Sequence, residues 1–159
     1  MKIKNSLILL FVLVLADQLS KLWVLQAIDP TNPLAVIPGF FNLVLVYNPG
    51  VAFGFMSAWD PFLRIILISL ISIVAVSFLL YLYFKSYRDH LYGSIAIVLI
   101  LSGAIGNIID RVRLSMVVDF LDVYIANWHW PAFNLADSFI CIGVGILLLL
   151  DWKPKEKNQ

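Results

Sequence analysis

The chain has 159 residues, of which 62% are hydrophobic and only 13% are charged, whereas a soluble domain of this size carries about a quarter charged residues. This composition excludes an ordinary soluble domain and indicates a membrane protein. A net charge of +1 without a dense basic run argues against a nucleic-acid partner. The single cysteine, Cys141, excludes an internal disulfide, and its apolar neighbours predict simple helix packing.

Four apolar stretches are long enough to cross a hydrocarbon core, which takes about 20 helical residues. We expect an all-α membrane protein, a single integral membrane domain over 1–159, with transmembrane helices at about 5–27, 61–84, 91–110 and 134–151. The first stretch resembles a secretory signal peptide, but no small-residue cleavage site follows it, so we interpret it as an uncleaved helix. The third contains Gly93, Gly103 and Gly106, which predict close helix approach.

The distribution of lysine and arginine predicts how the helices are oriented. Seven of the eleven basic residues fall before the first helix, between the second and third, and after the fourth: Lys2, Lys4, Lys85, Arg88, Lys153, Lys155 and Lys157. We expect that side, with both termini, to be cytoplasmic. The two long loops, about 28–60 and 111–133, then face outside.

The first outer loop contains the segment "GFFNLVLVYN" (39–48), in which apolar side chains alternate. A period of two predicts a strand, and its apolar character favours a place on the membrane surface. Trp59, Trp128 and Trp130 are typical of an interfacial aromatic belt.

Polar residues of three helices converge at the outer end of the predicted bundle. They are Asp17 and Lys21 on the first helix, Asn107, Asp110 and Arg111 on the third, and Asn134 and Asp137 on the fourth. Asp119 lies in the loop between the last two. Gly103, Asn107 and Arg111 are spaced i, i+4, i+8 and therefore share one helix face, which predicts an inward cavity. Ionisable residues in membrane spans usually mark function.

Each of these residues also has a structural interpretation. Asp17 and Lys21 have the spacing of an ion pair that fixes helix packing, and Asp110 and Arg111 suit a helix end. Asn134 and Asp137 have the spacing of a helix cap. Asp122 would be a solvated loop charge. For Asp119, in the apolar setting "MVVDFLDV", no such role is evident.

The chemistry that these residues support is acid–base catalysis by two carboxylates. A serine or cysteine mechanism needs a nucleophile beside a base, and His129, the only outer histidine, has no serine motif with it. No cluster of metal ligands is evident, and we expect no cofactor. Two close carboxylates share one proton, so one can activate water while the other donates to a carbonyl. Asp119 and Asp137 are the plausible pair.

Five segments carry a resemblance to a known family: "DQLSK" (17–21), "NPGVAFG" (48–54), "SGAIGNIIDR" (102–111), "VVDF" (117–120) and "FNLAD" (133–137). In this order they resemble the bacterial lipoprotein signal peptidases (signal peptidase II), which are intramembrane aspartyl proteases. The resemblance covers essentially the whole chain.

The resemblance implies a fold of four transmembrane helices with a small β-cradle and a short helix at the outer membrane surface. It implies a catalytic dyad of Asp119 and Asp137, with Asn48, Gly50, Asn107, Arg111 and Asn134 binding the substrate and Asp17 and Lys21 supporting the site. The implied substrate is a prolipoprotein with a diacylglyceryl-modified cysteine, cleaved just before that cysteine in the bacterial inner membrane. We expect contact with membrane lipid, no metal and a monomeric enzyme.

Two positions depart from the family pattern. Ser115 stands where the family often has a glycine two residues before "VVDF", and Ser102 replaces the first of two glycines in the third-helix motif. Both replacements are small and carry no proposed chemistry, although the loop around Asp119 can differ.

Two other classes of function stay open from the residues alone. Intramembrane Asp and Lys residues suit a proton-coupled transporter or channel, although the ionisable groups gather at one face and no repeat pair is evident. In a non-catalytic lipid-binding or assembly protein, the aspartates would serve as helix caps.

Overall fold

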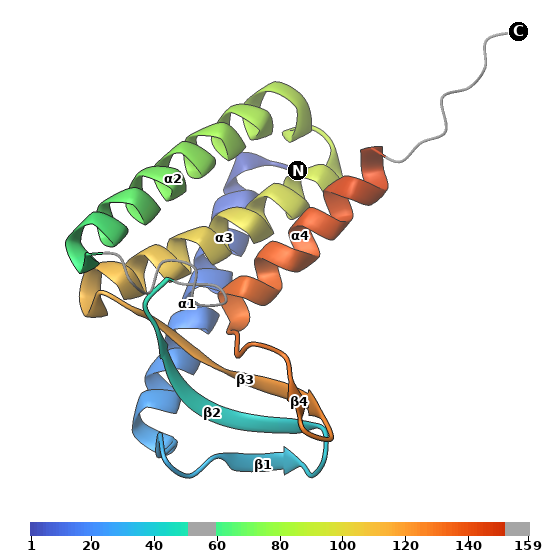
Figure 1. The fold of residues 1–159 in the computed structure, drawn as a ribbon. Helices are drawn as coiled ribbons and strands as arrows, with labels where there is room; N and C mark the ends of the chain where they lie inside the picture. The colour runs from blue at the N-terminus through green and yellow to red at the C-terminus, as the bar shows by residue number, and fades with distance from the viewer. Residues whose placement is uncertain (51–59, 152–159) are drawn as a thin grey trace, which may run out of the picture.

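The computed structural model describes residues 1–50 and 60–151. Its α-helices lie side by side, with a small sheet at one end of the bundle, here called the sheet end (Figure 1). The helices are α1 (Ile3–Ala27), α2 (Pro61–Leu82), α3 (Leu91–Leu114) and α4 (Leu135–Asp151), and α2 continues into a π-helical turn, η2 (Tyr83–Tyr87). The strands are β1 (Leu34–Ile37), β2 (Phe41–Asn48), β3 (Val117–Ile125) and β4 (Trp128–His129).

The helices confirm a multi-pass membrane protein. Three apolar segments in the described part of the chain are long enough to cross a membrane: Ile3–Ala27, Phe62–Tyr87 and Leu91–Leu114. The fourth helix is apolar and has 17 residues, or about 25 Å, near the lower limit for a span. Large aliphatic side chains cover the outside of the bundle, as lipid contact requires.

The central helix of the bundle is α3, which packs against α1, α2 and α4. The contact with α4 is closest where glycines replace side chains. A Cβ atom at Gly103 would collide with the Ala136 carbonyl oxygen, and one at Gly143 would collide with that of Ala96. The predicted close approach at Gly103 is therefore confirmed, and it holds the polar end of α3 against the start of α4.

The predicted end of the third helix, residue 110, is wrong by four residues. The helix continues to Leu114 and ends at Ser115, whose backbone adopts the left-handed conformation (φ 59°) and whose N–H donates to the Arg111 carbonyl. Asp110 is buried rather than snorkelling at a helix end, and its carboxylate accepts a hydrogen bond from Val118 N–H (3.2 Å). Asp110 thus belongs to the helix, and its carboxylate is used within the bundle.

The sheet runs in the order β1-β2-β3-β4 with antiparallel pairs throughout. The strand predicted at 39–48 is confirmed as β2. The predicted loop 111–133, in contrast, contains the end of α3 and the strands β3 and β4. The short outer helix implied by the resemblance does not occur in residues 1–50 or 60–151, while Trp59 and the "VAFG" segment (51–54) lie outside the described residues.

Candidate active site

Asp119 lies on β3 at the junction between the sheet and the bundle, and its side chain is buried (1% exposed). Asn48 pairs with Val117 across the β2–β3 ladder, which places its side chain diagonally beside Asp119. The Asn48 amide donates to one oxygen of the Asp119 carboxylate (Oδ2, 2.8 Å), and the Asn134 amide donates to the other (Oδ1, 2.7 Å). Both carboxylate oxygens are therefore held by neutral amide donors.

Asp137 lies in the first turn of α4, in a reciprocal capping arrangement with Asn134. The Asn134 side-chain oxygen accepts from Asp137 N–H (2.9 Å), and the Asp137 carboxylate accepts from Asn134 N–H (3.3 Å). The helix cap predicted from the sequence is thus confirmed. The cap uses only one oxygen of the Asp137 carboxylate. The other oxygen accepts from the Asn107 amide (Oδ1, 2.8 Å).

The segment before α4 brings the two aspartates together. Phe133 pairs with Leu121 of β3, accepting hydrogen bonds from Phe120 N–H and Leu121 N–H. This pairing places Asn134 beside Asp119 and starts α4 at the sheet. Asp119 and Asp137 then line one pocket of about 590 Å³ together with Asn48, Trp130, Pro131, Ala132, Phe133, Ser138, Cys141 and Ile142.

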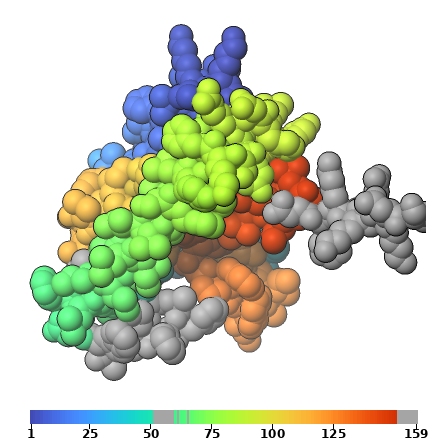
Figure 2. All heavy atoms as spheres, turned by 90° about the horizontal axis from the view of Figure 1, so that it is seen from above, coloured from blue at the N-terminus to red at the C-terminus, as the bar shows by residue number. Residues whose placement is uncertain are grey.

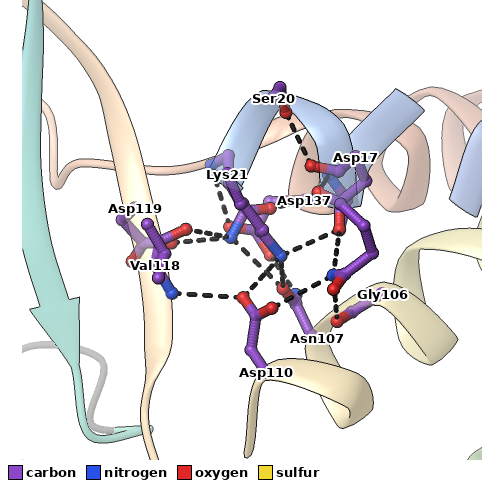
Figure 3. Close-up of polar contacts among 12 residues, drawn as sticks. Asp17, Ser20, Lys21, Gly106, Asn107, Asp110, Val118, Asp119 and Asp137 are labelled. Carbon is purple, nitrogen blue, oxygen red and sulfur yellow. Dashed lines mark hydrogen bonds and ion pairs between the residues drawn. The ribbon is translucent and has the colours of Figure 1, made fainter. Parts of the chain in front are cut away.

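Lys21 joins α1 to the same site, where its side chain lies among Asp17, Asn107 and Asp110 (Figure 3). Its ammonium group is buried and contacts Asp17 (3.0 Å), Asp110 (2.8 Å) and the side-chain oxygen of Asn107 (3.0 Å). Because the Asn107 oxygen faces Lys21, its NH₂ group faces Asp137. The predicted Asp17–Lys21 ion pair is confirmed, and Lys21 also fixes which end of the Asn107 amide meets the pocket.

Asp17 also contacts the start of α4. Its second oxygen accepts from the backbone N–H of Ala136 (3.0 Å), where a carboxylate is favoured by the helix dipole. Gln18, which no sequence pattern indicated, donates to Asp17, Asp110 and the Gly106 carbonyl. Asp17, its neighbour in the "DQLSK" segment, indicated that this part of α1 is functional, but a glutamine alone does not indicate a site.

The remaining candidates lie around the pocket rather than in it. Asn107 lies behind Asp137, and Arg111 donates weakly to the Asn107 carbonyl (3.4 Å) and lines a different cavity. Gly50 has a positive φ (88°), and its N–H donates to the Asn48 side-chain oxygen (2.9 Å). A side chain at Gly50 would collide with Ile68, so glycine keeps this turn close to α2.

The electrostatic environment of Asp119 favours its protonated form. Burial raises the pKa of the Asp119 carboxyl to about 6, the Asn48 hydrogen bond opposes that rise, and the negative charge of Asp137 adds to it. This carboxyl therefore binds a proton more tightly than an exposed aspartate does.

Two expectations from the sequence are wrong. Asp122 is not a solvated loop charge, because it is a buried residue of β3 that accepts from the Asn42 amide (2.9 Å) and contacts His129 Nδ1 (2.8 Å). Cys141 is exposed on the pocket wall instead of packed between helices. Asp137 and Cys141 are one turn apart, so a helix that presents the aspartate to the pocket presents the cysteine as well.

Within the described ranges, no group of three His, Cys, Asp or Glu residues is positioned to hold a metal ion.

The pocket walls formed by Trp130–Phe133 were not predicted, because their position depends on the pairing of residue 133 with β3.

Comparison with known proteins agrees with this arrangement. The chain matches the family model of signal peptidase (SPase) II over residues 9–153. The lipoprotein signal peptidase of Syntrophotalea carbinolica is 44% identical, with 100% of this chain and 99% of that protein covered. The lipoprotein signal peptidase of Janthinobacterium sp. (strain Marseille) is 47% identical, with 88% of this chain and 82% of that protein covered.

A solved bacterial membrane enzyme, determined by the in meso method at 1.9 Å resolution, has a TM-score of 0.85 and 32% identity, and the match covers 96% of each chain. The match spans both the helical bundle and the sheet. The chain therefore belongs to the signal peptidase II family of proteases, whose members remove signal peptides from prolipoproteins.

Proposed function

We propose that the chain is an aspartyl endopeptidase that cleaves diacylglyceryl-modified prolipoproteins just before the lipidated cysteine, using water activated between Asp119 and Asp137. The observation that carries this proposal is the single pocket lined by both carboxylates. Family membership supports the substrate class, and the buried setting of Asp119 supports the acid–base chemistry.

The proposed mechanism uses one proton between two carboxylates. The ionised aspartate accepts a proton from water, the resulting hydroxide equivalent attacks the scissile carbonyl carbon, and the protonated aspartate donates to the carbonyl oxygen. Collapse of the tetrahedral intermediate breaks the C–N bond, and a proton passes to the leaving amine of the cysteine. Asn48, Asn134 and Asn107 hold the two carboxylates in place without adding a charge that would ionise both.

Gly50 and Arg111 are proposed to bind the substrate beside this pocket, where the Asn48–Gly50 turn reaches α2 and α3. The buried Lys21 cluster is proposed as structural support, because it links α1 and α3 and, through Asp17, the start of α4.

The proposed setting is the bacterial inner membrane, with both termini cytoplasmic and the sheet end outside. The lysines and arginines near the other helix ends support this orientation. A lipidated cysteine keeps its acyl chains in the bilayer, so its peptide bond would lie near the surface, at the level of the aspartates.

The proposal is tested with the purified chain and a synthetic prolipoprotein in which the cysteine is either diacylglyceryl-modified or free. We expect cleavage of the modified substrate alone, with mass spectrometry showing the lipidated cysteine as the new N-terminus. An Asp119→Asn preparation controls for contaminating proteases. Cleavage at another bond, or equal cleavage of the unmodified substrate, would contradict the proposed specificity.

A further inference from the structure

A second cavity lies between α2 and α3, outside the pocket that holds the aspartates. This α2–α3 notch has a volume of about 230 Å³ and is lined by Ser69, Ser72, Ile73, Ile108, Arg111 and Val112. Val112 on its rim is 81% exposed on the outside of the bundle, so the notch adjoins the lipid-facing surface. Its lining is apolar except for two hydroxyls and one guanidinium group.

Arg111 is the charged residue among the described residues that line the notch. Its Nε is buried and has no hydrogen-bond partner within the described ranges 1–50 and 60–151, which is an unfavourable state for a charged donor. A ligand in the notch would therefore contact the terminal nitrogens of the guanidinium. The Ser72 hydroxyl donates its one proton to the Ile68 carbonyl (2.8 Å), so it offers no donor to a ligand oxygen. A ligand with carbonyl or ether oxygens on an otherwise apolar body matches this lining through the Arg111 guanidinium.

The notch lies near the sheet end of α3, which the proposed orientation places at the outer interface of the membrane. Arg111 is three residues before the sheet end of α3, or about 5 Å along the helix axis. None of the described α2 side chains is buried, and Figure 2 shows α2 as a ridge exposed along the bundle. Acyl chains can therefore reach the gap between α2 and α3 from the bilayer.

The notch and the catalytic pocket adjoin the same turn of α3. Arg111 donates to the Asn107 carbonyl, and the Asn107 amide donates to Asp137. The guanidinium is also attracted by the charges of Asp137 and Asp119. A molecule whose peptide bond lies at the aspartates could thus place a side-chain lipid in the notch.

We propose that the α2–α3 notch binds the ester oxygens of the diacylglyceryl group on the substrate cysteine, with Arg111 donating to an ester carbonyl and the acyl chains lying along α2 and α3. This inference rests on the proposed function and adds to it a subsite for the diacylglyceryl group, in which Arg111 is the donor and the small side chains of Ser69 and Ser72 leave room for the ligand. Ser69 and Ser72 would be specificity-determining residues, because larger side chains there would fill the notch.

The test fills the notch with a Ser69→Leu substitution and uses Ser77→Leu, an exposed position on the same helix, as the matched control. Two prolipoprotein substrates are compared, one with a diacylglyceryl cysteine and one with an S-hexadecyl cysteine that lacks ester oxygens. For Ser69→Leu we expect kcat/KM on the diacylglyceryl substrate to fall about tenfold, as loss of a charge-assisted hydrogen bond predicts. The loss should appear in KM, with little change on the S-hexadecyl substrate, while Ser77→Leu behaves as wild type.

Three outcomes would overturn the proposal. Equal kinetics of Ser69→Leu and Ser77→Leu would show that the notch does not read the substrate, and an equal loss on both substrates would show a packing defect. Each assay is run in phospholipid-free detergent and in phosphatidylglycerol vesicles. If the effect of Ser69→Leu requires phospholipid, the notch binds a free lipid instead. A wild-type enzyme that cleaves neither substrate would contradict the proposed function itself.

Discussion

At the scale of single residues, the oxygen and the NH₂ group of the Asn134 side chain have two different tasks. Its oxygen caps α4, and its NH₂ group donates to Asp119, with longer contacts to the Asn107 oxygen and the Val118 carbonyl. The cap holds Asp137 and the NH₂ group holds Asp119, so one amide links both carboxylates.

Substitutions at Asn134 can separate these tasks. Serine keeps a capping oxygen but has no NH₂ group, so Asn134→Ser should unfold near the wild-type temperature while its cleavage rate falls about tenfold. Asn134→Ala should lose the cap as well, at a cost of about 1 kcal/mol in the free energy of unfolding. Thermal unfolding in detergent and a cleavage assay measure the two effects. Wild-type cleavage by Asn134→Ser would show that the link to Asp119 is dispensable.

Asn48 affects the proton affinity of the pair. Burial raises the pKa of Asp119 to about 6, and the Asn48 hydrogen bond opposes this rise because it stabilises the ionised carboxylate. In Asn48→Ala the pKa should rise further. The shared proton is lost as pH increases, so the alkaline limb of the cleavage profile should move to higher pH.

Asn42→Ala is the matched control for this experiment, since Asn42 lies on the same strand but donates to Asp122. Its pH profile, normalised to its own maximum rate, should overlie that of the wild type. An unchanged profile for Asn48→Ala, or a shift to lower pH, would be inconsistent with the role given to Asn48.

At the scale of secondary-structure elements, the α3–α4 contact determines where Asp137 lies relative to Asn107. The two helices approach closely because Gly103 and Gly143 each face a backbone carbonyl of the other helix. Gly145 lies on the same helix as Gly143 but faces open space. Gly143 therefore permits the close contact with α3, whereas Gly145 does not contribute to it.

Alanine substitutions should reveal this difference. Gly103→Ala and Gly143→Ala should separate the helices and lower the unfolding temperature and the cleavage rate together. Gly145→Ala should be tolerated or stabilise the protein by up to about 1 kcal/mol, since alanine favours helix more than glycine does. Thermal unfolding of the three variants is the measurement. Equal destabilisation at Gly145 would contradict the packing described here.

The elements also show what could be predicted from the sequence. Long apolar stretches predicted the helices, because a bilayer demands about 20 apolar residues per span, and the alternation at 39–48 predicted β2. The strand β3 was missed because Val117–Phe120 is buried on both faces and does not alternate. The end of α3 was misplaced because Asp110 is paired inside the bundle with Lys21 and Gln18 of α1.

The candidate site was only partly predictable, because many of its contacts join residues from different elements. Helix spacing indicated that Asp17 and Lys21 form an ion pair and that Asn134 caps α4. The burial of Asp122 could not be predicted, since its partners Asn42 and His129 come from other strands. The α2–α3 notch likewise depends on how two helices pack, which hydropathy does not encode.

At the scale of the whole molecule, the bundle and the sheet meet at one level, and the polar side chains gather there. The helix α1 supplies Lys21, α3 supplies Asn107 and α4 supplies Asp137, while the sheet supplies Asp119. A transporter would instead need ionisable groups along a path through the bilayer. The described polar cluster lies beside the strands, at the sheet end (Figure 3).

The most direct test of the catalytic pair is single-turnover cleavage of a diacylglyceryl-modified prolipoprotein by Asp119→Asn, Asp137→Asn and the control Asp122→Asn, each checked for folding and membrane insertion. Both pocket variants should insert and fold yet show no detectable cleavage, whereas Asp122→Asn should retain activity. Near-normal cleavage by either Asp119→Asn or Asp137→Asn would contradict the assignment of these two aspartates as the catalytic pair.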